Sequence, residues 1–385
     1  MDDLLLVRDG ELFHLQGEKE TPFESPFAQA REAEDQRTFE NNRWRAGSGG
    51  MEENTQSMIP RGMLWGGKGQ LAPPQRPKIG YAFHAGERWY YTLTMPRAAG
   101  LFYWDRTRNE EVRLFHKQGF TSEPFCVLPD RRIIITARHE DGSGNLVLLD
   151  ENGVEREQLT EGDSVDSNPF FHDGWIYFDS TGLGRNAEGI VMAHAPTTIQ
   201  RMRLDSGEVE TVLEDEKFDL LSPKITESGT LYVLRIPKQS QARYGTGAAL
   251  KDAVLFPFRL LMGLFGFLAL FSQFFGNQKL TSSQGPRVER DLSQARIQQR
   301  FVDIEKESKK AGEKVAAPES WELIRVRNSN IESVARRVCA FEIAGDKVLY
   351  SRGYDLREPE GGVRKTSGEL ITALSGYSQR LVSVS

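Results

Sequence analysis

The feature of this chain that most constrains its fold is a recurring pair of short hydrophobic strands joined by a polar turn. The clearest copies are residues 101–115, 146–159 and 202–213, and looser copies are 323–334 and 370–381. Their turns are rich in Asp, Asn, Ser and Gly, which tolerate the backbone angles of a tight hairpin. The pattern therefore predicts antiparallel β-hairpins along most of the chain.

A second kind of hairpin precedes these copies. Pro124, Pro169 and Pro223 each begin such a segment, at intervals of 45 and 54 residues, and related segments begin at Ile79 and Val338. Four short strands at this period are typical of a propeller blade. We therefore predict an all-β fold, a β-propeller of about six four-stranded blades, with five or seven blades and a β-sandwich as alternatives.

The segments around these prolines resemble the TolB-like (PD40) propeller repeat. They read Glu-Pro-Phe followed by Leu-Pro-Asp-Arg-Arg-Ile, Asn-Pro-Phe followed by His-Asp-Gly-Trp-Ile, and Ser-Pro-Lys followed by Glu-Ser-Gly-Thr-Leu. In that repeat a proline enters the innermost strand and a Pro-Asp-Gly-type turn leaves it. The resemblance covers about five repeats from Ile79 onward. It implies a propeller fold and says little about activity, because such blades serve many roles.

The connections between the predicted strands differ in length. The long ones are residues 26–77, 182–198, 237–320 and 352–368, and all should emerge at one face of a propeller. We expect residues 1–236 and 321–385 to form the propeller, with 26–77 as an extended loop that begins with a helix. Residues 237–320 would be a helical insertion between two strands of one blade. Leu4–Phe23 would close the ring with the C-terminal blade.

The insertion contains a strongly apolar segment at residues 253–275. From Leu260 to Gln278 there are 19 residues without a charge, which is close to the roughly 20 that span a bilayer. Both ends must return to neighbouring strands, so a single full crossing is excluded. The sequence therefore predicts a monotopic helix lying in the membrane interface, followed by a solvated or partner-binding helical arm at 287–310. A helix buried against the propeller or a partner chain is the alternative.

The predicted membrane-binding side chains are the large apolar residues of this segment and the cations around it. Six basic residues and one acidic residue occur between Arg235 and Lys279, which favours an anionic membrane surface. The residues predicted to bind the membrane are Lys251, Phe256, Phe258, Arg259, Leu260, Leu261, Phe265, Phe267, Leu268, Leu270, Phe271, Phe274, Phe275 and Lys279.

Residues with catalytic or metal-binding patterns are scarce. The six histidines lack metal-ligand spacing, and no Gly-x-Ser-x-Gly nucleophile motif occurs. Cys126 and Cys339 each lie in an apolar run and are predicted to be buried free thiols. We therefore expect no cofactor and no metal, and predict a non-enzymatic scaffold or recruitment protein that binds an unidentified protein partner. The alternative is an enzyme or small-ligand sensor that uses the central channel, with Arg97, His139, Asp166 and Arg185 as candidate ligand-binding residues.

Charge and the N-terminal residues bear on partners and location. The chain has 49 basic and 55 acidic residues, a net charge of −6, which argues against nucleic-acid binding. The N-terminus begins with acidic residues and has a short apolar run, unlike a secretory signal. We expect a cytoplasmic protein, peripheral or monotopic on the inner face of the cytoplasmic membrane.

Overall fold

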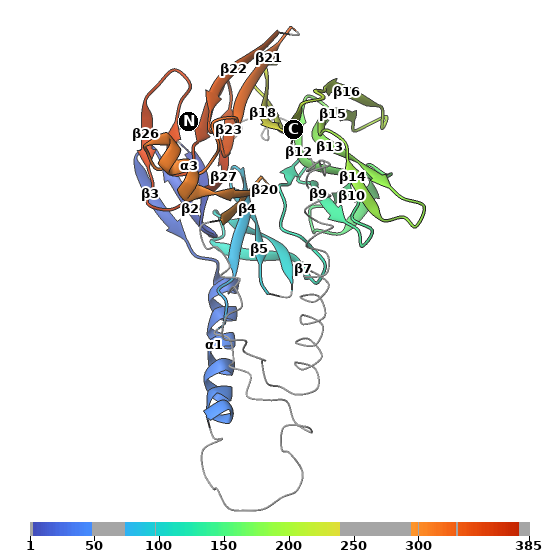
Figure 1. The fold of residues 1–385 in the computed structure, drawn as a ribbon. Coiled ribbons are helices and arrows are strands. Elements are labelled where there is room, and N and C mark those ends of the chain that lie inside the picture. The colour runs from blue at the N-terminus through green and yellow to red at the C-terminus, as the bar shows by residue number, and fades with distance from the viewer. Residues whose placement is uncertain are drawn as a thin grey trace, which may run out of the picture. The chain divides into compact units, whose positions relative to one another are not determined.

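The computed structural model describes residues 3–47, 74–96, 98–238, 294–298, 300–328 and 330–376, and these residues are mostly β-strand (Figure 1). The chain divides into two compact regions. One comprises Met1–Arg31, Gln75–Lys238 and Leu292–Ser385, and the other comprises Glu32–Pro74 and Gln239–Asp291. All the strands of the described residues belong to the first region, and so do the candidate sites.

The first region is built from four-stranded antiparallel meanders, which we call units and name by their first strand. In the β4 unit, β4 (Lys78–Ala85), β5 (Arg88–Thr94), β6 (Ala99–Asp105) and β7 (Glu110–Lys117) pair in chain order. Strand β5 is buried on both faces, with Tyr91 and Leu93 in one hydrophobic cluster and Tyr90 in the next. Each sheet therefore packs face to face between two neighbours.

The remaining units follow the same plan. Gly144 and Val165 make one parallel bridge, which joins the unit that begins with β8 to the unit that begins with β12. An additional strand, β14 (Val191–His194), pairs with the end of β13 (Trp175–Arg185). The units are β8 (Cys126–Val127), β9 (Ile133–Arg138), β10 (Gly144–Leu149), β11 (Glu155–Gln158); β12 (Ser164–His172), β13 (Trp175–Arg185), β15 (Thr198–Arg203), β16 (Val209–Leu213); β17 (Phe218–Ile225), β18 (Leu231–Pro237), β21 (Glu322–Arg327), β22 (Asn330–Arg336); and β23 (Ala340–Ala344), β24 (Lys347–Ser351), β25 (Asp355–Arg357), β26 (Val363–Thr366).

The two ends of the chain share one sheet. Strands β1 (Asp3–Arg8), β2 (Glu11–Gln16) and β3 (Lys19–Phe23) join β27 (Ile371–Gly376) in the order β27-β1-β2-β3, which we call the β27 unit. This pairing confirms the prediction that the N-terminal strands pair with C-terminal residues. The first strands contact one another in the cyclic order β4, β8, β12, β17, β23, β27 and β4 again. The arrangement is propeller-like, as the repeat predicted.

Two predictions about the strands are wrong. The hairpin predicted at 370–381 does not supply the third strand of the last meander, because 371–376 is β27 and pairs with β1; residues 377–381 lie outside the described part of the chain. The third and fourth strands of that meander are β25 and β26, which lie in the predicted loop 352–368. The physical reason is that β1 offers β27 a long partner edge, and this long-range pairing outweighs the local hairpin pattern.

The end of the insertion also differs from the prediction of a helical arm over 287–310. Strands β19 (Gln294–Ile297) and β20 (Arg300–Asp303) form a hairpin, and helix α3 covers only Ile304–Ala311. Ile297 and Val302 are buried in the hydrophobic cluster between the β17 and β23 units, together with Ala316. Because these apolar side chains enter the core, this part of the insertion is not a solvated arm.

Helix α1 (Pro26–Gly47) lies at the start of segment 26–77, where the sequence predicted a helix. Its N-terminus is capped by Ser25, whose Oγ accepts a hydrogen bond from the Ala28 amide at 3.1 Å. The Glu111 carboxylate accepts from the Phe27 amide at 2.7 Å and from the Ser25 hydroxyl. The start of the helix is therefore held by the β4 unit.

The apolar segment 253–275 lies outside the described residues. Within those residues, neither helix is long and apolar enough to span a membrane. Cys126 and Cys339 are buried free thiols, as predicted.

Candidate functional site

A cavity of about 690 Å³ lies where the first strands of the units meet. Residues of β4, β8, β12, β17, β23 and β27 all line it, so it occupies the centre of the cyclic arrangement. Its volume falls in the range of about 300–1,000 Å³ that is usual for ligand pockets. Six aromatic residues contribute to its wall: Tyr81, Phe83, Phe125, Phe170, Phe171 and Phe341.

The shape of the wall depends on bulges in the first strands. Asn168 and Ser222 have positive φ angles of 53° and 54°, and each precedes a proline that lines the cavity. The register of β12 shifts at this point against β13, and the register of β17 shifts in the same way against β18. Two of the prolines recognised in the repeat, Pro169 and Pro223, therefore mark places where the strands bend around the cavity.

A buried carboxylate, Asp179, holds these two bulges together. It accepts hydrogen bonds from the Ser167 hydroxyl (2.6 Å), the Asn168 side-chain amide (2.6 Å) and the Ser222 backbone amide (2.8 Å). Burial raises the pKa of Asp179 to about 6, and these hydrogen bonds act in the opposite direction. Asp179 thus joins the β12 unit to the β17 unit beside the cavity.

Two of the nucleophile candidates on the cavity wall, Lys224 and Cys126, are restrained. Lys224 of β17 makes an ion pair with Glu342 of β23, with 2.6 Å between Nζ and Oε2. Glu342 also accepts the Ile343 amide at 2.9 Å. Burial raises the pKa of the Cys126 thiol to about 12, so this thiol stays protonated at neutral pH. These contacts disfavour covalent chemistry at Lys224 and at Cys126.

The ligand-binding residues predicted from the sequence do not converge on the cavity. His139, Asp166 and Arg185 are absent from its lining, and Arg97 lies outside the described residues. Each of the three makes contacts elsewhere. His139 Nε2 is 3.3 Å from the Asn145 side-chain amide, and Asp166 accepts a hydrogen bond from the Ser180 hydroxyl at 2.6 Å. Arg185 makes ion pairs with Asp163 at 2.6 Å and with Asp141 at 3.1 Å. The predicted membrane-binding residues, Lys251 to Lys279, are also outside the described part of the chain.

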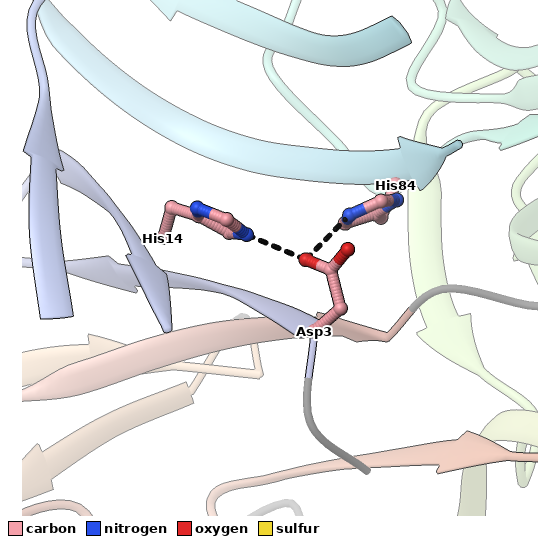
Figure 2. Close-up of side chains that lie close together, drawn as sticks. All are labelled: Asp3, His14 and His84. Atoms are coloured by element: carbon pink, nitrogen blue, oxygen red, sulfur yellow. Dashed lines mark hydrogen bonds and ion pairs between the residues drawn. The ribbon is translucent and has the colours of Figure 1, made fainter. Parts of the chain in front are cut away.

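A second cluster, which the sequence did not reveal, consists of Asp3, His14 and His84 (Figure 2). The Nε2 atoms of His14 and His84 lie 2.5 Å and 2.9 Å from the same oxygen of Asp3, Oδ1. Both histidines are buried. Positions 3, 14 and 84 have no spacing typical of metal ligands, so only the pairing of β1 with β2 and the packing of β4 bring them together.

The contacts around this cluster fit hydrogen-bond donors better than metal ligands. The Gly86 amide donates to Nδ1 of His84 at 3.2 Å, so the neutral ring carries its proton on Nε2 and donates it to Asp3. A metal-bound histidine normally has the reverse arrangement, with its second nitrogen donating a proton. Arg106 also lies 3.8 Å from Asp3 Oδ2, which opposes a bound cation. The residues present therefore do not fit a metal centre.

Comparisons with known proteins bear on the fold alone. No family model matches the sequence, and no curated protein matches it. The chain is structurally similar to TolB from Acinetobacter baumannii, with a TM-score of 0.45 and 8% identity, over 97% of this chain and 65% of TolB. It thus spans slightly less than two thirds of that protein.

Two further solved structures are similar to this chain. The tricorn protease matches with a TM-score of 0.46 and 10% identity, over 96% of this chain and 33% of the protease. A chain of the nidogen/laminin complex matches with a TM-score of 0.47 and 10% identity, over 97% of both chains. All three TM-scores are below 0.5, so none of these similarities bears on the function of this chain.

Proposed function

We propose that this protein is a non-enzymatic scaffold that binds a protein partner at its central cavity and acts at the cytoplasmic surface of a membrane. The observation that carries the first part is the cavity wall, which combines rigid strands and six aromatic side chains with a lysine already held in an ion pair. Aromatic groups supply large contact areas at protein interfaces, and paired charges supply orientation. Such a role does not require Lys224 to leave its ion pair with Glu342.

We infer that the units close into a ring of six blades. The cyclic contacts of the first strands support this closure. The hydrophobic clusters support it too, since each lies between two successive units, and one of them joins the β27 unit to the β4 unit. A closed ring would hold the cavity wall in one geometry, as a docking site requires.

The membrane part of the proposal rests on the sequence of residues 253–275. About a dozen large apolar side chains would be available to the membrane interface, at about 1.5–3 kcal/mol for each one that is fully buried. Half that gain still exceeds what stable attachment needs. The basic residues Lys251, Arg259 and Lys279 would each add about 1 kcal/mol near an anionic surface.

The partner-binding test is a capture experiment on solubilised native membranes. Phe171→Arg places a charge on the cavity wall, and Val209→Arg places the same charge at an exposed position of β16. We expect the wall variant to lose a specific partner that the wild type and the surface variant both retain. Equal recovery by all three proteins would contradict docking at the cavity.

The membrane part of the proposal is tested by sedimentation of the full-length protein with phosphatidylserine vesicles. Deletion of residues 237–320 is unsuitable, because Ile297 and Val302 belong to the core. Replacing Leu261, Phe265 and Leu268 with Asp should instead reduce the bound fraction at least tenfold. Replacing the three basic residues with Gln should weaken binding mainly at low salt. A full-length protein that stays monomeric and unbound without detergent would show that the apolar segment is buried in protein.

A small-molecule sensor or enzyme is the second candidate. It is supported by the cavity volume and by the position of His172 and Asp173 on the lining. A ligand that raises the melting temperature, or a turnover that is lost on changing either residue, would favour this function over the scaffold.

A further inference from the structure

The ring of units is closed by strands from opposite ends of the chain. Strand β27 pairs with β1, with Leu4 opposite Gly376 and Leu5 opposite Ser375. No covalent link joins them, since both cysteines are free and lie elsewhere. The strength of this seam, by which we mean the β1–β27 pairing and its contacts with β4, therefore depends on noncovalent contacts alone.

Asp3 accepts hydrogen bonds from two strands at this seam (Figure 2) and also makes an ion pair with an arginine. His14 reaches it from β2, His84 from β4, and Arg106, which follows β6, lies 3.8 Å from its second oxygen. The backbone amide of His84 also donates to the hydroxyl of Ser375 on β27, at 2.9 Å. His84 thus contacts both strands of the seam, through its ring and through its backbone.

His84 fits this position only as a neutral ring. Its Nδ1 accepts the Gly86 amide, so a second proton on the ring would place two donors face to face. The ring is buried, which makes a positive charge costly. Among the residues that the structure describes, the charged or titratable groups that act on it include Asp3, His14 and Arg106. Of these three, Asp3 favours the charged ring, and its carboxylate is already shared with the other two groups.

We propose that the seam is an acid-sensitive latch, in which protonation of His84 breaks its contact with Gly86 and loosens the pairing of β1 with β27. Burial lowers the pKa of His84 below its usual 6.5, with Asp3 acting in the opposite direction. As the pH falls below about 6.5, His84 therefore binds a proton less readily in the closed seam than in the open one. The contribution of His84 to the stability of the closed seam is fully present above that pH and is lost as the pH falls below it.

The first test is amide hydrogen exchange of the full-length protein, followed by mass spectrometry at pH 7.5, 6.5 and 5.5 and corrected for intrinsic rates. The opening constant of the β1 and β27 amides should rise by up to about tenfold per pH unit below 6.5, for one proton. Amides of β9, which lies away from the seam, should show no such change. Equal protection of β1 and β27 at all three pH values would overturn the proposal.

Two variants then assign the effect to the ring of His84. His84→Gln keeps a donor for Asp3 but cannot be protonated, so the pH dependence at the seam should disappear. His194→Gln removes an exposed histidine of β14 and should leave it intact. The proposal is also overturned if Zn²⁺ at neutral pH protects the same amides in the wild type, since the cluster would then hold a metal and not protons.

Discussion

Replacing Asp179 with Asn separates the charge of this buried group from its shape. The carboxylate accepts hydrogen bonds from Ser167, Asn168 and Ser222. An Asn side chain can keep its oxygen toward the last two residues and turn its amide toward the Ser167 hydroxyl, which can accept. The variant should therefore retain the bulges at the cavity while losing the buried charge.

The magnitude follows from the pKa of Asp179. Burial raises this pKa from 3.8 to about 6, so the folded protein binds more protons than the unfolded chain between these values. Stability contributed by the group is therefore lost as the pH rises through this range. Two pH units at 1.36 kcal/mol each give a cost of about 3 kcal/mol for the ionised carboxylate at pH 7.5. Roughly half of that cost is already present at pH 5.

The assay is urea unfolding of Asp179→Asn and wild type at pH 7.5 and pH 5.0, with tryptophan fluorescence as the signal. The advantage of the variant over wild type should be about 1.4 kcal/mol larger at pH 7.5 than at pH 5.0. The comparison at each pH cancels the effect of the seam, which both proteins share. A difference that is independent of pH, or larger at pH 5.0, would refute the assignment of a raised pKa to Asp179.

Two further substitutions test the packing around the cavity and the core. Lys224→Met leaves the buried Glu342 without its cation and should cost about 3 kcal/mol in urea unfolding, whereas Lys224→Met combined with Glu342→Met should cost much less. Gly353→Ala should lower stability by about 3 kcal/mol in urea unfolding, because Gly353 has a φ of 114° and a Cβ there would lie 2.4 Å from the Ala316 side chain. The control is Gly362→Ala, where a Cβ would meet open space; it should change stability by less than about 0.5 kcal/mol in the same assay.

The sequence predicted correctly those hairpins whose formation depends on residues close together in the chain. The segments that begin at Pro124, Pro169 and Pro223 fold as the first two strands of their units, because alternating apolar residues and turn chemistry act over a few residues. Residues 371–376 and 294–303 were predicted wrongly because distant partners decide their structure. In the first case the partner is β1, and in the second it is the cluster between the β17 and β23 units.

The candidate sites were harder to predict than the strands. The Lys224–Glu342 pair joins residues 118 positions apart. The cluster at Asp3 brings β1 and β2 together with β4, although α1 and a long segment separate these strands in the sequence. No pattern of spacing encodes such contacts, since they arise when separate units pack. Pro169 and Pro223 were a local signal near the cavity, because they mark two bulges that line it.

The seam and the cavity share strand β27, and this connects the two proposals. Thr372 to Gly376 line the cavity, and within that stretch Ser375 accepts the His84 amide and pairs with Leu5. Loosening of β27 at the seam would therefore move one wall of the cavity, while the Asp179 network that holds β12 to β17 would stay intact. A partner bound at the cavity would favour the closed position of β27. By thermodynamic linkage, the bound partner would then stabilise the closed seam against acid by the same factor by which acid weakens binding of the partner.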